Sequence, residues 1–151
     1  MRLIFTWKRK MNLYIDTSAL MKLFIQETYS DDIRLLLKNA DLVATGLITR
    51  AETAAGINRL TRMNVIKQKE CEAALSNFRK EWGDYHRILI TEQIVIRADF
   101  LTGQHSLRGY DAIHLACALT WSELLGAPVM MATFDKELHE AAKKSGIEVF
   151  P

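Results

Sequence analysis

The segment that decides the fold is LYIDTSAL, at residues 13–20. It opens with three apolar residues of the kind that fill a buried strand, and Asp16 follows them directly. The apolar residues beyond Asp16 recur at helical spacing, which predicts a helix over residues 18–26. A strand that passes directly into a helix is the repeating unit of α/β proteins, so we expect a parallel sheet.

The rest of the chain alternates short β-rich runs with longer helical patterns. We expect strands at residues 13–16, 42–45, 87–90, 129–133 and 147–150, and further helices at residues 33–37, 47–63, 67–82, 92–101, 111–125 and 136–144. Gly146 is placed to end the last helix. This alternation predicts a Rossmann-like α/β fold, in which helices cover both faces of a central parallel sheet.

The composition is that of one ordinary globular domain. The 151 residues are 49% hydrophobic and 25% charged, with 7 Gly and 2 Pro, which excludes collagenous, low-complexity and disordered classes. Cys71 and Cys117 show no metal-ligand or disulfide-scaffold pattern. No apolar run is long enough to cross a bilayer or to act as a secretory signal, so we expect a cytoplasmic protein without membrane contact. Residues 12–151 are expected to form the domain, and residues 1–11, with a basic run at 8–10, a possible N-terminal extension.

Two acidic residues follow predicted strands. Asp16 ends the first strand, and Asp135 lies two residues past the strand at residues 129–133. Because the carboxyl ends of parallel strands meet at one edge of the sheet, where ligands bind, we expect both side chains at that edge. Each residue also precedes a helix, so either could instead be an N-cap that accepts backbone N–H bonds.

Two further acidic residues lie within predicted helices. Glu52 is expected about a turn and a half inside the helix at residues 47–63, beside a strip of small residues, where a carboxylate needs a partner. The alternative for Glu52 is a surface ion pair with Arg50 or Arg59. Asp111 opens a helix that is apolar nearly all round, and there it either caps the helix or faces a cation.

As a set, the four acidic residues predict a metal site. Carboxylates without accompanying Cys or His ligand spacing suit a hard divalent cation, with Mg²⁺ or Mn²⁺ ahead of Zn²⁺. Close carboxylates repel one another, and a cation offsets that repulsion. Since Mg²⁺ readily takes phosphate oxygens, the set indicates phosphoryl chemistry. The net charge of +2 includes these four negative charges, so the rest of the molecule would carry +6 and attract a polyanion.

Four segments, in this order, resemble the PIN-domain nucleases, and most closely the toxins of VapBC toxin-antitoxin pairs. They are YIDTSAL at residues 14–20, TRAE at 49–52, LRGYDAIHLA at 107–116 and ATFD at 132–135. By this resemblance, the family's acidic metal-binding quartet corresponds to Asp16, Glu52, Asp111 and Asp135. Thr17 and Thr133 match polar positions beside the quartet, and Thr133 is counted with the catalytic residues.

The resemblance implies a single PIN-like domain that acts as an Mg²⁺- or Mn²⁺-dependent endoribonuclease. It further implies an RNA substrate, a cognate antitoxin that neutralises the toxin, and a homodimer. The alternative is a catalytically inactive PIN-like module that binds RNA or protein. The apolar residues of the helices at 33–37 and 47–63 either belong to the core or accept the antitoxin or a second copy.

Other signals are weaker or point elsewhere. Basic residues near the acidic motifs could meet RNA phosphates, although such residues more often form the solvated face of a helix; they are Lys22, Arg50, Arg59, Arg62 and, as the strongest candidate, Arg108. His114 is expected at the edge of the core, without a ligand role. Zincin, dinucleotide-binding, Walker and Gly-x-Ser-x-Gly motifs are absent from the sequence. A haloacid-dehalogenase-like phosphatase would need a second acid where Ser18 stands.

Overall fold

The structure is a computed structural model that describes residues 10–151. The possible N-terminal extension falls almost entirely on residues 1–9, which lie outside the described residues. Within residues 10–151, no helix is long and apolar enough to cross a membrane.

A five-stranded parallel sheet forms the centre of the domain, as the sequence predicts. Its strands are β1 (Asn12–Ile15), β2 (Leu42–Gly46), β3 (His86–Ile88), β4 (Val129–Ala132) and β5 (Glu148–Phe150), and they lie in the order β3-β2-β1-β4-β5. All neighbouring pairs are parallel, and Ile15 at the end of β1 is in register with Ala132 at the end of β4. Chain segments that leave β1 and β4 therefore start side by side.

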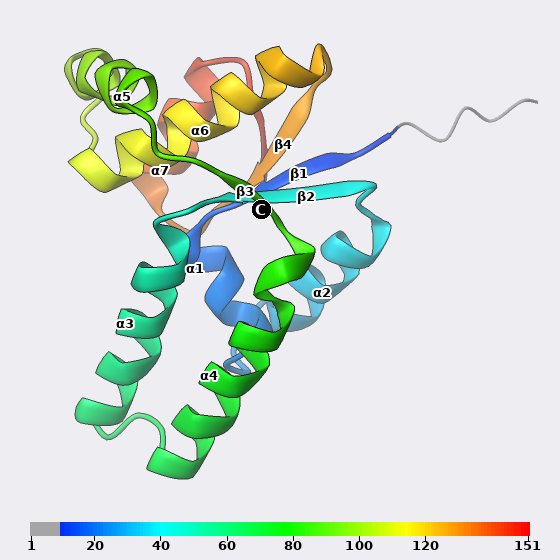
Figure 1. Ribbon diagram of the computed structural model, residues 1–151, viewed down its shortest axis with the longest axis vertical. Coiled ribbons are helices and arrows are strands. Elements are labelled where there is room, and N and C mark those ends of the chain that lie inside the picture. Colours follow the sequence, from blue (N-terminus) through cyan, green and yellow to red (C-terminus); the bar gives the residue numbers. More distant parts are fainter. Residues whose placement is uncertain (1–9) are drawn as a thin grey trace, which may run out of the picture.

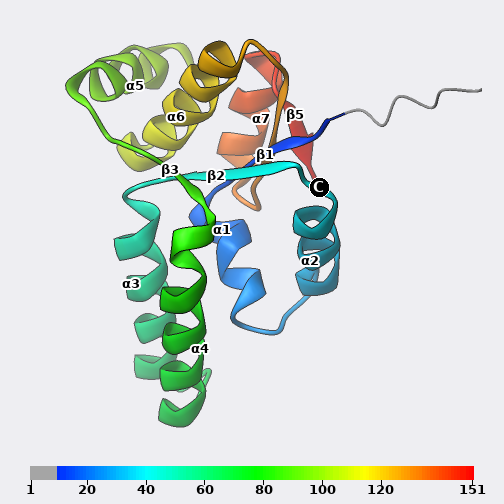
Figure 2. The same ribbon diagram turned by 45° about the vertical axis from the view of Figure 1, so that its right-hand side comes forward.

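Helices cover both faces of this sheet (Figures 1 and 2). One layer contains α5 (Glu92–Gln104), α6 (Gly109–Leu125) and α7 (Lys136–Lys144), and the other contains α1 (Thr17–Leu20), α2 (Ser30–Asn39) and α4 (Gln68–Glu81). Side chains of β1 alternate between the two layers: Tyr14 packs in the core under α6, whereas Leu13 and Ile15 pack in the core beside α1 and α2.

The hairpin of α3 (Thr49–Arg62) and α4 extends away from the sheet (Figures 1 and 2). It has its own small core, in which Ile57 on α3 packs with Cys71 and Ala74 on α4. The small residues of α3 allow a close approach, because a Cβ added at Gly56 would lie 2.6 Å from Sδ of Met21.

Several helical boundaries differ from the prediction, and two of them lie next to the predicted acidic residues. The helix expected at residues 18–26 is the short helix α1 followed by the 3₁₀ turn η1 (Met21–Leu23), where Phe24 N–H bonds to the Met21 carbonyl. The helix expected from residue 47 begins at Thr49, because the Leu47 N–H still bonds to the carbonyl of Ile88, the last residue of β3. Glu52 therefore lies in the first turn of α3, and the prediction that placed it deeper in the helix is wrong.

Candidate active site

The four predicted acidic residues come to one edge of the sheet from four different elements. Asp16 and Asp135 follow β1 and β4, which are neighbouring strands. Glu52 lies in the first turn of α3, which follows β2, and Asp111 lies in the first turn of α6. All four acidic residues that the sequence predicts for the site therefore lie near the carboxyl ends of the strands.

Asp16 is a buried carboxylate whose two oxygens are both hydrogen-bonded. Its side chain is the N-cap of α1, since Oδ1 accepts a hydrogen bond of 2.9 Å from the Ala19 N–H. The same oxygen also accepts a hydrogen bond of 2.7 Å from the Ser18 hydroxyl. Oδ2 accepts a hydrogen bond of 2.6 Å from the Thr133 hydroxyl. Burial raises the pKa of Asp16, although the charge of His114 and these hydrogen bonds act in the opposite direction. The N-cap interpretation is thus correct for one oxygen, while the other is held by Thr133, which directly follows the neighbouring strand β4.

Thr133 and Asp135 form a short turn between β4 and α7. The Asp135 N–H donates to the Thr133 hydroxyl at 3.1 Å, and that hydroxyl donates onward to Asp16. Oδ1 of Asp135 caps α7 by accepting 2.8 Å from the Leu138 N–H. Asp135 is therefore an N-cap, and its backbone also orients the hydroxyl that holds Asp16.

Glu52 has different partners from the arginines that the sequence offers. Its Oε1 accepts 2.9 Å from the Thr17 hydroxyl and lies 2.8 Å from Nε2 of His114. Arg50 instead stacks over Trp82, with its guanidinium carbon 5.7 Å from the ring centroid. Burial alone would raise the pKa of Glu52, but the hydrogen bond and charge of His114 and the bond from Thr17 lower it below its ordinary value.

Of the four acidic residues, Asp111 is the one whose side chain has no hydrogen-bond partner among residues 10–151. It therefore does not cap α6. The pKa of Asp111 is raised to about 6, first by burial, then by the charge of Asp135 and more weakly by those of Asp16 and Glu52, while the charge of His114 opposes the shift. The charges of the other three carboxylates therefore all act on Asp111.

Three residues of the site were not predicted. Ser18 joins Asp16 to the segment after β4, because its hydroxyl donates to Asp16 and accepts a hydrogen bond of 2.8 Å from the Phe134 N–H. His114 and Tyr14 lie behind Glu52, with the Tyr14 hydroxyl 2.7 Å from Nδ1 of His114. The available signal for His114 was its position three residues after Asp111, on the same side of α6, in an otherwise apolar run.

The donor chemistry of this edge fits a hard divalent cation. The available donors are carboxylate and hydroxyl oxygens, the ligands that Mg²⁺ and Mn²⁺ prefer. In the described chain, neither Asp16, Asp111 nor Asp135 forms an ion pair with Lys or Arg, so their mutual repulsion is not offset by a basic side chain. Within residues 10–151, however, no three Asp, Glu, His or Cys side chains already stand as the ligands of one ion. The carboxylates of the described chain lie near one another without forming a closed set of ligands.

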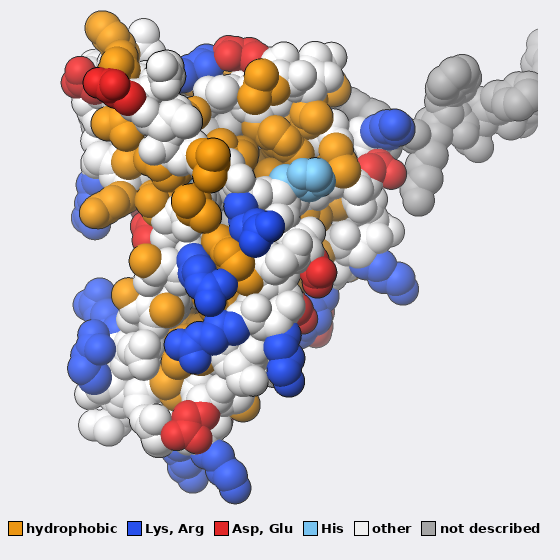
Figure 3. Space-filling view, in the orientation of Figure 1, with side chains coloured by type: hydrophobic (Ala, Val, Ile, Leu, Met, Phe, Trp, Pro, Cys, Tyr) orange, Lys and Arg blue, Asp and Glu red, His pale blue; other side chains and the backbone are white. Residues whose placement is uncertain are grey.

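The basic residues near the acidic motifs have different environments. Lys22 is used internally, since its Nζ bonds to Glu27 at 3.1 Å and lies 4.3 Å from the centroid of the Phe134 ring. Arg108, one residue before α6, is exposed and makes no ion pair within the described chain. Figure 3 shows Lys and Arg side chains along the α3–α4 hairpin and across the middle of this face, below an apolar area beside α5 and α6.

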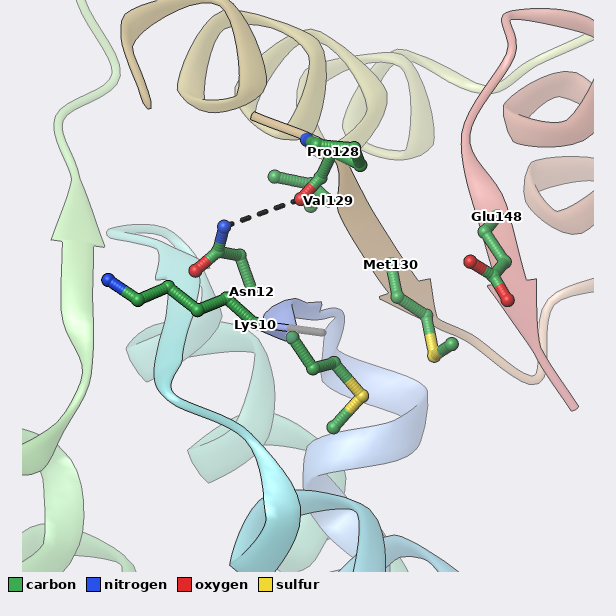
Figure 4. A pocket seen from close by; sticks show the side chains of 7 residues that line it. Lys10, Asn12, Pro128, Val129, Met130 and Glu148 are labelled. Carbon is green, nitrogen blue, oxygen red and sulfur yellow. Dashed lines mark hydrogen bonds between the residues drawn. The ribbon is translucent and has the colours of Figure 1, made fainter. Parts of the chain in front are cut away.

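A separate hollow of about 210 Å³ lies at the opposite edge of the sheet, at the amino ends of β1 and β4 (Figure 4). The side-chain amide of Asn12 donates a hydrogen bond of 3.4 Å to the Pro128 carbonyl there. Its lining includes one acidic and one basic side chain, Glu148 and Lys10. This hollow lacks the acidic cluster and is separated from that cluster by the length of the strands.

The sequence profile of the PIN domain family matches residues 13–144. Among curated proteins, Ribonuclease VapC49 of Mycobacterium tuberculosis is 29% identical over 140 residues, covering 92% of this chain and 94% of the relative. Among solved structures, a toxin-antitoxin complex from Klebsiella pneumoniae (21% identity, TM-score 0.59) covers 83% of this chain and 88% of its own. Mycobacterium tuberculosis VapC20, a toxin that cleaves the sarcin-ricin loop, has 18% identity and a TM-score of 0.63 and covers 92% of this chain and 99% of its own.

This acidic edge on a five-stranded parallel sheet is the arrangement expected of a PIN-like nuclease. The chain belongs to the PIN domain family. The predicted fold class is confirmed.

Proposed function

We propose that this protein is a metal-dependent endoribonuclease and the toxin of a toxin-antitoxin pair. The observation that carries the proposal is the convergence of four carboxylates. Burial, and then the charges of the other three carboxylates, raise the pKa of Asp111 to about 6. Such a group needs a cation, and its oxygen donors suit one that binds phosphate. The ribonuclease and toxin descriptions of the related proteins support the same reading.

Asp16, Glu52, Asp111 and Asp135 would hold Mg²⁺ or Mn²⁺ at this edge. Such a cation lowers the pKa of water and offsets charge on the leaving oxygen of a phosphodiester. Thr133 and Ser18 keep the Asp16 carboxylate in place, and Thr17 does the same for Glu52. Asp111, whose side chain has no partner in the described chain, is free to turn toward a ligand.

Attack by water on the phosphorus of an RNA phosphodiester, with the 3′-oxygen as the leaving group, leaves a 5′-phosphate and a 3′-hydroxyl. This reaction uses neither the 2′-hydroxyl as nucleophile nor a pair of histidines. The exposed guanidinium of Arg108 is the candidate contact to an RNA phosphate outside the metal site.

The proposal is tested by incubating the purified protein with RNA in Mg²⁺, in Mn²⁺ and in EDTA, and by analysing the ends of the products. We expect cleavage with either metal, none in EDTA, and 5′-phosphate ends. Asp16→Asn and Asp111→Asn should abolish cleavage, while the matched control Glu148→Gln, at the opposite edge of the sheet, should retain it. Cleavage in EDTA, or 2′,3′-cyclic phosphate ends, would reject the mechanism.

A binding module without turnover is the second candidate, because the ligand cage is not closed in the described chain. This candidate predicts that the wild-type protein retains RNA in a filter-binding assay with Mn²⁺ and leaves it intact. It also predicts that Asp111→Asn changes neither outcome.

A protein partner would cover apolar surface that the domain leaves open. Of the helices proposed for this role, α2 places Ile33 in the core but leaves Leu35 59% exposed, and Met63 after α3 is 58% exposed. A second apolar surface on α5 and α6 includes Val95 and Tyr110, which are exposed and line one hollow. We propose a cognate antitoxin and a homodimer, acting in the cytoplasm. A monomer by sedimentation, with no binding to the product of a neighbouring gene, would contradict both assignments.

A further inference from the structure

A buried chain of hydrogen bonds runs from the core of the domain to Glu52. The Tyr14 hydroxyl, on β1, lies 2.7 Å from Nδ1 of His114, on α6. Nε2 of the same ring lies 2.8 Å from Oε1 of Glu52, on α3. Tyr14 is fully buried and His114 is 2% exposed, so water does not substitute for these partners. The chain joins three elements that are distant in the sequence.

The chemistry of the two ends fixes the direction of the chain. An ionised carboxylate only accepts hydrogen bonds, so Nε2 of His114 must carry the hydrogen that points at Glu52. When the imidazole is neutral, Nδ1 has a lone pair and the Tyr14 hydroxyl is the donor to it; when the ring is protonated, Nε2–H still points at Glu52. Both ring nitrogens are satisfied in this arrangement, and the tautomer of the neutral ring is set by the Glu52 carboxylate.

The result of this arrangement is that Glu52 is held by one oxygen. Thr17 and His114 both donate to Oε1, whereas Oε2 has no hydrogen-bond partner within the described chain. Carboxylates that bind metals are commonly oriented in this way, with hydrogen bonds behind them that fix the side chain.

We infer that His114 is a positioning residue, which Tyr14 contacts at Nδ1 and which donates from Nε2 to Glu52, so that Oε2 is left for a divalent cation. This inference rests on the proposed function for the identity of the ligand. The role differs from that of a histidine at the edge of the core, because a purely packing role would not require the ring to donate in one direction.

The tautomer can be measured in the metal-free protein by long-range ¹⁵N–¹H NMR of the histidine rings, with the His114 signals assigned by their loss in His114→Gln. We expect the Nε2–H tautomer in the wild type and a mixture of tautomers in Glu52→Leu, which removes the acceptor of the Nε2–H bond. A His114 ring that carries its hydrogen on Nδ1 alone would overturn the inference.

Binding of Mn²⁺, measured by calorimetry on folded protein, tests the consequence for the ligand. His114→Leu should weaken binding by about 10- to 100-fold, and His114→Gln, whose amide can donate from a position similar to that of Nε2, should recover part of the loss. Wild-type affinity in a folded His114→Leu protein, or equal losses in both variants, would overturn the inference. If the wild type binds no Mn²⁺, the proposed metal site fails, and the NMR measurement still decides whether His114 donates to Glu52.

Discussion

The Thr133 hydroxyl donates a 2.6 Å hydrogen bond to Oδ2 of Asp16. The two residues directly follow the neighbouring parallel strands β1 and β4, so the bond connects the ends of these two strands. Because the same hydroxyl accepts from the Asp135 N–H, it has a fixed orientation. One side chain therefore connects two of the four acidic residues.

Replacement of Thr133 by Val should remove this connection without changing the shape of the side chain. We expect a loss of about 1–3 kcal/mol in the free energy of unfolding, because a buried carboxylate oxygen loses its donor. RNA cleavage should fall by about 10- to 100-fold. Urea unfolding and cleavage rates check the prediction, and Thr133→Ser, which keeps the hydroxyl, is the control. Equal effects of Val and Ser would show that the methyl group matters and the hydrogen bond does not.

Asp111 should make the metal-free protein less stable as pH rises. Its folded pKa of about 6, which burial and then Asp135 raise, exceeds that of an unfolded Asp, so the stability linked to its proton is complete below about pH 4 and is lost as pH rises through 6. We expect Asp111→Asn to be more stable than wild type at pH 7.5 in EDTA, by on the order of 1 kcal/mol after allowance for solvent screening.

The measurement is urea unfolding of both proteins in EDTA at pH 5 and pH 7.5. The advantage of Asp111→Asn should grow between these two values, while Glu148→Gln should show no such growth. A constant difference between wild type and Asp111→Asn would argue against a raised pKa at this position.

Divalent metal should stabilise the fold even in the absence of RNA. A ligand at 100 times its Kd adds about 2.7 kcal/mol, which corresponds to a rise of roughly 5–10 °C in Tm for a domain of this size. Thermal unfolding with increasing Mn²⁺ checks the prediction, and Asp16→Asn should show little response. A similar rise in wild type and Asp16→Asn would place the metal elsewhere on the molecule.

Two glycines should respond differently to Ala. A Cβ at Gly46 would lie 3.1 Å from the Tyr14 hydroxyl, which is buried and held by His114, so we expect Gly46→Ala to cost about 1–3 kcal/mol. A Cβ at Gly56 would meet the end of the flexible Met21 side chain, and the higher helix propensity of Ala offsets its movement. Gly56→Ala should therefore stay within about 1 kcal/mol of wild type.

Chemical denaturation of both variants decides this comparison. NMR of the His114 ring in Gly46→Ala should additionally show a shifted Nδ1 signal, since the Tyr14 hydroxyl must move. Similar stability of the two variants would mean that the contact at Tyr14 relaxes as easily as the one at Met21.

Local patterns in the sequence determined much of the fold. The alternation of strands and helices predicted the parallel sheet, and the rule for strand ends predicted the common edge of Asp16 and Asp135. Glu52 and Asp111 were assigned to the same site as members of the set of four acidic residues, and then by family resemblance. These properties depend on residues close together in the chain, or on a topology that many sequences share.

Only the tertiary structure decided how each acid is held. Glu52 accepts from a histidine 62 positions away, that histidine meets a tyrosine 100 positions away, and Thr133 reaches Asp16 across 117 positions. Periodicity does not encode such pairs, because it describes which face of an element is buried and not which side chain lies opposite. The direction of each hydrogen bond is set when distant elements pack together, and buried polar groups are stable there only where their partners match.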